Sequence, residues 1–401
     1  NIEINKNNLL ELDKNIINKI SEVLDVPTSF LIKSDQLPYF IFRSKEDLEK
    51  TKRPITRDKI HFYNYYTLPS PKGYVAPVLI DILCPKERLP KLNNGHLEQA
   101  ITINLGKSDI FGRWGKKRDK TNFSKIRFNN SSRNSWIIGD TYVEPTYCPH
   151  SYSRATESNS QILSYTAKSP LESLVKKLNN WSSENYYNFM KKININDPRL
   201  SILKMYLDNK GVSLNYLSKI FKIKITNIKQ ILRNKKILFK TCNFLKIDQN
   251  LFFKKKYPSE DKLGKTYLSY KNSFKSIRKY KSYTIASMAS SERYTDLFGY
   301  FIKVSNKKKI KDLSDYASSH YLVTGGNIMF HVDNTKIKLK KGDALWMSSF
   351  KQHGFSGEGS LIKISNGESL STSDLSEVLN IYNLNITLKR SYKDKVSWGY
   401  D

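Results

Sequence analysis

The chain has 401 residues, a length that exceeds one ordinary domain and allows about two to four domains with cores of their own. Its 68 lysines and arginines outnumber 37 aspartates and glutamates, and the formal net charge of +31 favours an anionic partner such as a phosphonate, a phosphate or nucleic acid. No apolar run approaches the roughly 18 residues of a membrane span, so we exclude an integral membrane protein and expect no membrane partner.

The cysteine content indicates the compartment. Cys84, Cys148 and Cys242 are odd in number and lack Cys-x-x-Cys spacing, which argues against a disulfide framework or a zinc knuckle. The N-terminal stretch is polar and amphipathic and has no apolar signal-peptide core. We therefore expect a soluble protein in the reducing cytoplasm.

Helical and β-type segments alternate along the chain and define the predicted domain plan. Residues 1–50 carry apolar residues at helical spacing up to a break at Asp25, and predict an N-terminal helical module. Residues 51–169 change to short apolar and aromatic runs separated by a Pro- and Gly-containing turn, which predicts a β-barrel. Residues 170–260 are helical and rich in lysine, and residues 261–401 return to short strands before a C-terminal helix and tail.

The central helical segment carries the pattern of a helix-turn-helix. Ser213 is placed to cap a short helix, and after a break Thr226 is placed to cap a second one. Such a pair of helices is typical of proteins that enter the DNA major groove. Because the end of this segment resembles the N-terminal stretch, we expect each barrel to be preceded by its own helical module.

The candidate metal ligands lie between Asn93 and Ser164. His96 and His150 are two of only six histidines in the chain, and Glu144 stands six residues before the second. Two neutral imidazoles and one carboxylate on neighbouring strands form the facial site in which divalent iron keeps positions open for substrate and oxygen.

The second half of the chain repeats this pattern with one change. The step from Gly139 to His150, GDTYVEPTYCPH, recurs as GDALWMSSFKQH, which ends at His353, and His320 upstream is placed as the counterpart of His96. Met347 falls where Glu144 would be, and no carboxylate stands in register. We therefore expect a catalytic first barrel and a structural second one, in which His320, His331 and His353 form at most a weak metal site.

Five stretches carry a resemblance to a known family: NNGHLEQAITINLG, GDTYVEPTYCPHSYS, LSYTA, HFYNYYTLPSPKG and the closing WGYD. They resemble the family of 2-hydroxyethylphosphonate dioxygenase and methylphosphonate synthase. The resemblance implies a mainly β fold with α-helices, in which two tandem cupin (double-stranded β-helix) barrels each follow a helix-turn-helix-like module. It also implies a mononuclear non-heme Fe(II) oxygenase that cleaves the carbon–carbon bond of 2-hydroxyethylphosphonate with O2 and without 2-oxoglutarate, and we expect a homo-oligomer.

The resemblance also implies roles for individual residues. The metal ligands would be His96, Glu144 and His150, and Tyr142 and Glu144 would act in catalysis. The residues that would bind the substrate are Arg57, Tyr65, Asn93 and Ser164. Their chemistry agrees, because a phosphonate dianion is best held by a guanidinium and several neutral donors.

The choice between the two enzymes of the family depends on Gln99. Methylphosphonate synthases use a glutamine among their iron ligands, and Gln99 lies three residues after His96, so it is an alternative third ligand to Glu144. In a regular strand positions 96 and 99 face opposite ways, so Gln99 reaches a metal only if a bulge re-aims it. Gln99 favours methylphosphonate synthase, and so does the abundance of Lys, Asn and Ile, which an AT-rich genome would produce. Glu144 favours the dioxygenase. Our sequence-based preference is the synthase, with both assignments open.

A cupin-type DNA-binding regulator is the competing class of function. The helical modules and the charge of +31 support it, and residues 226–230 could present polar side chains to DNA. A regulator needs no intact iron triad, however, and helix-turn-helix units also serve as packing modules. We therefore do not expect nucleic acid as a partner.

Overall fold

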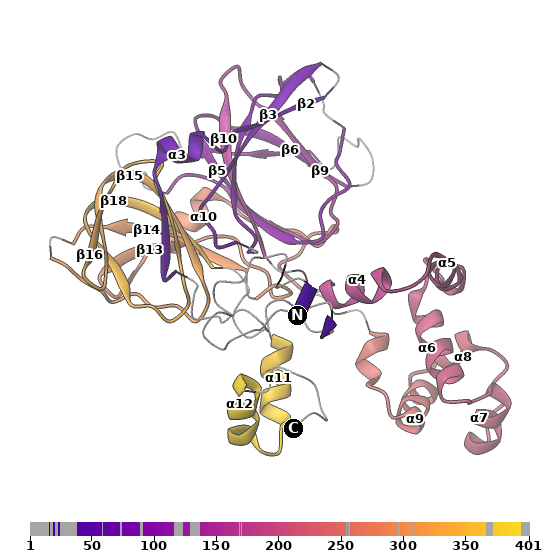
Figure 1. Ribbon diagram of the computed structural model, residues 1–401. Coiled ribbons are helices and arrows are strands. Elements are labelled where there is room, and N and C mark those ends of the chain that lie inside the picture. Colours follow the sequence, from indigo (N-terminus) through magenta and orange to yellow (C-terminus); the bar gives the residue numbers. More distant parts are fainter. Residues whose placement is uncertain are drawn as a thin grey trace. The chain divides into compact units, whose positions relative to one another are not determined.

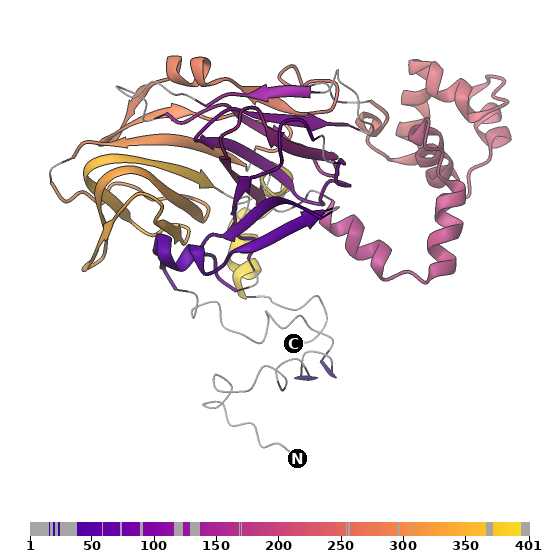
Figure 2. The same cartoon turned by 90° about the horizontal axis from the view of Figure 1, so that it is seen from above.

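The chain forms two compact units, Pro170–Pro258 and the remainder, Asn1–Ser169 with Ser259–Asp401. The structure is a computed structural model (Figures 1 and 2). It describes residues 16, 19–20, 23–24, 38–57, 59–72, 74–88, 91–115, 123–128, 137–167, 169, 171–253, 255, 257–295, 297–306, 308–365 and 372–393.

The larger unit is mainly β, and we divide it into two halves by its sheets. The first half contains two antiparallel sheets. The seven-stranded sheet has the order β11-β8-β5-β10-β4-β3-β2, and the three-stranded sheet has the order β7-β6-β9. Their strands are β2 (Arg53–Arg57), β3 (Ile60–Thr67), β4 (Val78–Ile82), β5 (Gln99–Gly106), β6 (Ile110–Trp114), β7 (Phe123–Ile126), β8 (Thr141–Glu144), β9 (His150–Arg154), β10 (Ser160–Ala167) and β11 (Thr266–Leu268).

The second half forms one antiparallel sheet of eight strands, in the order β1-β17-β15-β18-β14-β13-β12 with β16 paired to β15. These strands are β1 (Phe40–Arg43), β12 (Arg278–Tyr280), β13 (Tyr283–Ser287), β14 (Phe298–Val304), β15 (Ser319–Val332), β16 (Thr335–Leu339), β17 (Ala344–Met347) and β18 (His353–Ser365).

The expected closed barrels are not seen as such. Within the described ranges, no pairing joins the two ends of any of these strand orders. In the first half, β5 and β6 belong to different sheets, and so do β9 and β10, because turns interrupt the ladder at both places. The strands therefore pair as open antiparallel sheets.

The two halves exchange a strand at their edges. β1 precedes the first sheets in the chain but pairs with β17, with Phe40 opposite Met347. Conversely, β11 follows the helical unit but pairs with β8, with Thr266 opposite Val143. Figure 1 shows the resulting contact between the sheets of the two halves. Each half therefore completes the sheet of the other, which the predicted boundaries at residues 50 and 261 did not anticipate.

The central strand β5 is buried on both faces, because one face lies in the interior of the first half and the other in a core shared by the two halves. In β5, Ile101 and Ile103 lie in a core common to the two halves, together with Phe301 and Ile362 of the second. Thr102 between them faces the interior of the first half, since side chains alternate along a strand. This interior is lined by aromatic and aliphatic side chains that include Tyr63, Tyr142, Tyr152, Trp114 and Ile162.

The smaller unit is entirely helical. Its elements are α4 (Glu172–Asn179), α5 (Ser183–Lys192), α6 (Pro198–Asn209), α7 (Leu214–Phe221), α8 (Ile228–Arg233), α9 (Lys235–Leu245) and the 3-10 helix η3 (Gln249–Phe252).

Their common core includes Leu203, Leu217 and Ile231. Ser213 caps α7 as predicted, by accepting from the backbone N–H of Tyr216. The predicted cap Thr226 is wrong by one residue, because Asn227 accepts from the Gln230 N–H at the start of α8. The Thr226 N–H instead donates to the side-chain oxygen of Gln230.

The remaining elements of the larger unit are short helices. They are α3 (Lys45–Glu49), α10 (Tyr270–Lys275), α11 (Thr372–Asn380) and α12 (Leu384–Lys393). The predicted N-terminal helical module falls mostly outside the described residues, and the described end of that segment is β1 followed by α3. In the part of the chain that the structure describes, no helix is both long and apolar enough to cross a membrane.

A buried ion pair lies inside the second sheet. Lys363 on β18 is 1% exposed and contacts the carboxylate of Asp315 and the hydroxyl of Tyr300. The Asp315 side chain is 17% exposed and also accepts from the Ser319 hydroxyl at 2.9 Å. A lysine in such a place is stable only while its partner is present, because an unpaired buried charge is costly.

We predict that Lys363→Met lowers the free energy of unfolding by about 3 kcal/mol, since it leaves the Asp315 carboxylate without its cation. Urea unfolding of the full chain measures the loss. Lys50→Met is the matched control, because the Lys50–Asp47 pair in the same unit has side chains 75% and 51% exposed, and no measurable change is expected there. Equal changes in the two variants would contradict the prediction.

Candidate metal centre

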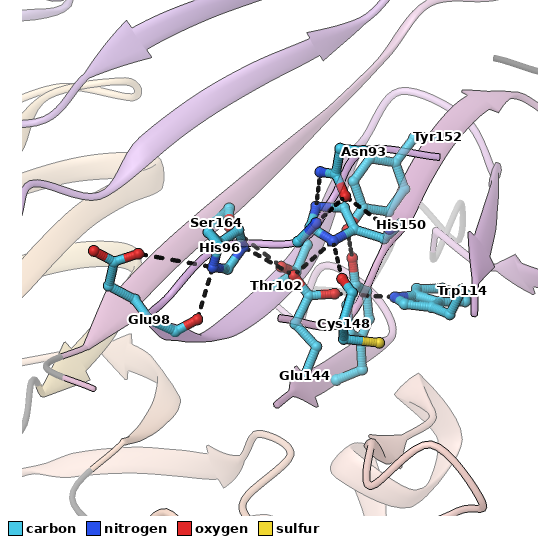
Figure 3. A network of polar contacts seen from close by, with 12 residues as sticks. Asn93, His96, Glu98, Thr102, Trp114, Glu144, Cys148, His150, Tyr152 and Ser164 are labelled. Carbon is cyan, nitrogen blue, oxygen red and sulfur yellow. Dashed lines mark hydrogen bonds and ion pairs between the residues drawn. The ribbon is translucent and has the colours of Figure 1, made fainter. Parts of the chain in front are cut away.

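Three side chains from different elements converge in the interior of the first half (Figure 3). His96 lies in the segment before β5, Glu144 is the last residue of β8, and His150 is the first residue of β9. Ala100 of β5 pairs with Glu144, and Trp114 of β6 pairs with His150, so strand register positions the group. One ligand atom from each residue lies within 4.8 Å of the others. Among the described residues no other group of three His, Cys, Asp or Glu side chains comes as close together.

Backbone carbonyls fix both imidazoles. Nδ1 of His96 lies 2.7 Å from the carbonyl oxygen of Glu98, and Nδ1 of His150 lies 2.9 Å from that of Cys148. A carbonyl only accepts, so each Nδ1 carries the proton and each Nε2 keeps its lone pair. Hydrogen bonds of this kind orient metal-ligating histidines and set their tautomer.

The Asn93 amide supports this assignment for His150. Its oxygen accepts from the backbone N–H of Gly95 and of His150, at 2.9 and 2.8 Å. Its nitrogen must therefore be the atom 3.0 Å from Nε2 of His150, and it donates to that lone pair. Asn93 thus tethers the segment before His96 to the start of β9.

Glu144 is the charge at the centre of the group. It is 1% exposed, and its Oε1 lies 3.3 Å from Nε2 of His96 and 3.4 Å from Nδ1 of His150. Its Oε2 accepts from the indole N–H of Trp114 at 3.0 Å. Burial raises the pKa of the Glu144 carboxyl, but the two imidazoles and Trp114 outweigh it and hold the pKa below its usual value.

The same electrostatics act on His96. Burial lowers the pKa of its imidazole, while Glu144 and Glu98 raise it, and the net pKa lies above the usual value. A buried carboxylate beside two imidazoles therefore attracts positive charge, either a proton or a metal ion. Two histidine nitrogens and one carboxylate oxygen are a donor set that fits ferrous iron.

Hydroxyl groups line the interior beside the triad. Thr102 pairs with both Tyr142 and Ser164 in the sheet, and its hydroxyl donates to that of Ser164 at 3.4 Å. The hydroxyls of Tyr142 and Tyr152 are hydrogen-bonded to each other. Burial raises the pKa of Tyr142 well above its usual value, so its hydroxyl stays protonated. These groups form a neutral polar surface on the face that carries Glu144.

Two of the predicted substrate-binding residues lie on the strands farther along the same sheet. Tyr65 of β3 is half-buried at the edge of the interior core, opposite Ile80 of β4. Arg57 is the last residue of β2 and pairs with Ile60. Their roles toward a substrate stay predictions.

Gln99 lies on the other face of β5 from the carboxylate. It opens the strand, so alternation gives it the same face as Ile101 and the opposite face from Ala100, the partner of Glu144. Gln99 is buried, 4% exposed, on the side of the core shared by the two halves. Gln99 pairs with Ala167 of β10 in the same register as Ala100 with Thr166, so no bulge re-aims it there.

Sequence reasoning missed Trp114, Thr102 and Tyr152. The alternation of β5 could have identified Thr102, because it stands two residues from Ala100 on the same face. Trp114 carries no such signal, since its contact with Glu144 joins strands 30 residues apart.

The sequence repeat predicts the position of His353 in the second sheet correctly, but not that of His320. His353 matches His150, because its Nδ1 also lies 2.9 Å from a carbonyl oxygen two residues earlier, that of Lys351. His320, however, pairs with Trp346 and packs against Tyr165 of the first half, so it faces the shared core. The expectation that His320 stands where His96 stands is therefore wrong.

Strand register identifies the true counterparts. Ser319 pairs with Met347 as Ala100 pairs with Glu144, and Asp315 precedes Ser319 by four residues as His96 precedes Ala100. Likewise, Tyr321 pairs with Lys363 as Thr102 pairs with Ser164. The second sheet thus has a lysine ammonium hydrogen-bonded to Asp315, and the hydroxyl of Tyr321 lies 2.7 Å from Nε2 of His353.

Comparison with known proteins gives a consistent result. Residues 49–167 match the family model described as 2-hydroxyethylphosphonate dioxygenase cupin-like domain. The chain is 35% identical over 396 residues to 2-hydroxyethylphosphonate dioxygenase of Streptomyces viridochromogenes, an alignment that covers 95% of this chain and 88% of the relative.

Solved structures resemble the chain over nearly its whole length. A variant of 2-hydroxyethylphosphonate dioxygenase is 34% identical with a TM-score of 0.74, covering 93% of this chain and 89% of that one. PhpD with cadmium, complexed with hydroethylphosphonate, is 35% identical with a TM-score of 0.71, covering 93% and 90%. The Streptomyces albus enzyme with substrate 2-hydroxyethylphosphonate and Fe(II) bound shares the fold, with a TM-score of 0.65 at 14% identity over 95% and 88% of the two chains. Sequence, fold and the His96-Glu144-His150 group agree, and the chain belongs to the 2-hydroxyethylphosphonate dioxygenase family.

Proposed function

We propose that this chain is an Fe(II)-dependent oxygenase that cleaves the carbon–carbon bond of 2-hydroxyethylphosphonate with O2. The observation that carries the proposal is the convergence of His96, Glu144 and His150 within 4.8 Å in the interior of the first half. Three protein ligands leave positions free for a substrate and for oxygen. Relatives with 34 and 35% identity over nearly the whole chain act on or bind this phosphonate, which supports the choice of substrate.

His96, Glu144 and His150 would hold the iron, which when bound supplies Lewis acidity and activates dioxygen. Glu144 enters as a carboxylate because its pKa is lowered, and His96 enters with its proton on Nδ1. His150 also carries its proton on Nδ1, so its Nε2 would exchange the hydrogen bond from Asn93 for the metal. The chain's other residues bind and orient the phosphonate. We assign that role to Arg57, Tyr65, Asn93 and Ser164, and we assign Tyr142 as a protonated donor near the reacting carbon atoms.

The geometry favours the dioxygenase outcome, in which 2-hydroxyethylphosphonate and O2 give hydroxymethylphosphonate and formate. The sequence-based preference for methylphosphonate synthase rested on Gln99 as a ligand. Because Gln99 lies on the face of β5 away from Glu144, that support is lost, and Glu144 is the better candidate for the third ligand. We therefore propose the carboxylate-ligated dioxygenase, with the synthase as the second candidate.

We keep four broader expectations as proposals. The domain plan of two cupin barrels with helical modules is supported by the repeat of β17 and β18 on β8 and β9, and by the helical unit between them. A reducing cytoplasm is supported by three free, buried cysteines. A homo-oligomer and the independence from 2-oxoglutarate rest on the family resemblance alone.

The metal site gives the first test of this function. Purified protein loaded anaerobically with ferrous iron should bind about one ion per chain, because the described residues form one donor set of the required kind. His96→Ala and His150→Ala should each lose iron and activity together. His320→Ala is the matched control, since that histidine faces the shared core, and iron should be retained. If iron is retained in the first two variants and lost when His353 is replaced, the metal site lies in the second half and our assignment is wrong.

The product is tested by phosphorus NMR of iron-loaded protein incubated with 2-hydroxyethylphosphonate in air. We expect a hydroxymethylphosphonate signal together with one formate per turnover, because the carbon–carbon bond breaks and both oxygen atoms of O2 enter the products. A methyl-coupled phosphorus signal would instead identify the synthase. No turnover by protein that has bound iron would contradict both candidates.

Arg57 is tested through the charge of the substrate. Arg57→Ala should raise KM for the phosphonate and lower kcat, since misplacing a substrate by about 1 Å costs on the order of a hundredfold. Arg53→Ala, at the opposite end of β2, is the control and should have a smaller effect. If both variants lose activity to a comparable extent, β2 contributes to the fold and Arg57 does not bind the phosphonate.

A further inference from the structure

We propose that Trp114 is a positioning residue that restricts Glu144 to one metal-binding oxygen, and so keeps a coordination position open for substrate and O2. The inference deepens the proposed metal site and rests on it. Its basis is the unequal surroundings of the two carboxylate oxygens, because Oε1 faces both imidazoles while Oε2 accepts from the Trp114 indole N–H at 3.0 Å. Figure 3 shows Trp114 and His96 on opposite sides of the carboxylate.

The number of oxygens matters because coordination positions are few. A facial triad uses three of about six positions around divalent iron. A substrate that binds through two oxygens takes two more, which leaves one for O2. If Glu144 turned to present both oxygens, it would take that last position. A hydrogen bond to Oε2 opposes the turn, because rotating the carboxylate would leave a buried N–H without its acceptor.

The indole is held firmly enough to do this. Trp114 is 2% exposed and ends β6 directly opposite His150, so its backbone is tied to a ligand. Its ring packs edge-on against Tyr142, with ring centroids 5.1 Å apart at 80°. Gly112 makes room for it, since a Cβ at that position would lie 2.2 Å from the ring. This close packing opposes rotation of the ring.

A lysine from the second half covers the ring. The ammonium of Lys265 lies 4.3 Å from the centroid of Trp114 and is 3.5 Å from Oδ2 of Asp261. Lys265 is 8% exposed, immediately before β11, the strand that the second half adds to the first sheet. A cation over an indole is attracted to its face, so Lys265 fixes the ring from that side. The strand exchange between the halves therefore reaches the carboxylate through Lys265 and Trp114.

The test removes the N–H and keeps an aromatic ring at position 114. Trp114→Phe and the natural protein are loaded with Mn²⁺, and the exchangeable waters on the metal are counted by water proton relaxation. We expect about three waters on the natural protein and about one fewer on Trp114→Phe, with a raised KM for the phosphonate. Trp346→Phe is the matched control, because this tryptophan is also buried and lies in the second sheet, away from the triad. It should keep the natural count.

The outcomes separate this inference from the proposed function. A natural count in Trp114→Phe overturns the role of Trp114 and leaves the metal site standing. If the natural protein binds neither Mn²⁺ nor Fe(II), the metal site itself is overturned.

If Trp114→Phe fails to fold, infrared difference spectra of the natural protein decide. With glutamate labelled by ¹³C, the metal-loaded minus metal-free spectrum should show the wide splitting of the two carboxylate stretches that one-oxygen binding gives. A narrow splitting, typical of binding through both oxygens, overturns the proposal.

Discussion

The site depends on one buried carboxylate. Glu144 is 1% exposed and lies between two imidazoles and an indole, none of which carries a fixed positive charge. Removing a carboxylate from water costs several kcal/mol unless a positive charge or hydrogen bonds compensate. The fold provides the hydrogen bond from Trp114. The imidazole nitrogens beside the carboxylate are ligands for a divalent cation, and that cation completes the compensation. Function follows from this constraint because the cation that satisfies Glu144 is also the one that activates oxygen.

The second sheet meets the same kind of constraint with a protein cation. Asp315 stands four residues before Ser319, as His96 stands before Ala100, and Lys363 stands where Ser164 does in the strand register. The ammonium of Lys363 contacts Asp315 and Tyr300, so the charge is balanced within the chain. Met347 in place of Glu144 removes the carboxylate from the central position. The duplicated fold therefore holds a metal donor set in one half and an internal ion pair in the other.

Much of the site could be predicted from the sequence because two of its ligands, Glu144 and His150, lie in one continuous motif. The spacing of Glu144 and His150, and the repeat that ends at His353, follow from the local geometry of two strands and a turn. His320 was misassigned because the spacing between the first histidine and the Gly-Asp step differs in the two copies. By strand register His320 is the counterpart of Ile101, which faces the shared core, and Asp315 is the counterpart of His96. The N-cap at Asn227 was missed for a local reason, since Thr226 next to it has equivalent chemistry.

What the sequence could not predict depends on contacts between distant segments. β1 pairs with β17, and β11 with β8, between segments far apart in the chain, and no local pattern encodes which edge a short strand joins. The role of Trp114 likewise depends on Lys265, 151 residues later, which lies over its ring. These long-range contacts surround the local motif and hold Trp114 beside the Glu144 carboxylate.

The most direct test of this account is the position of the metal in crystals grown anaerobically with ferrous iron. An anomalous difference map collected at the iron absorption edge should show one peak per chain, coordinated by His96, Glu144 and His150, with one oxygen of Glu144 bound and the other on the Trp114 indole. The region of Asp315, His353 and Lys363 should show no peak. A peak between Asp315 and His353, or iron bound without Glu144, would contradict the account.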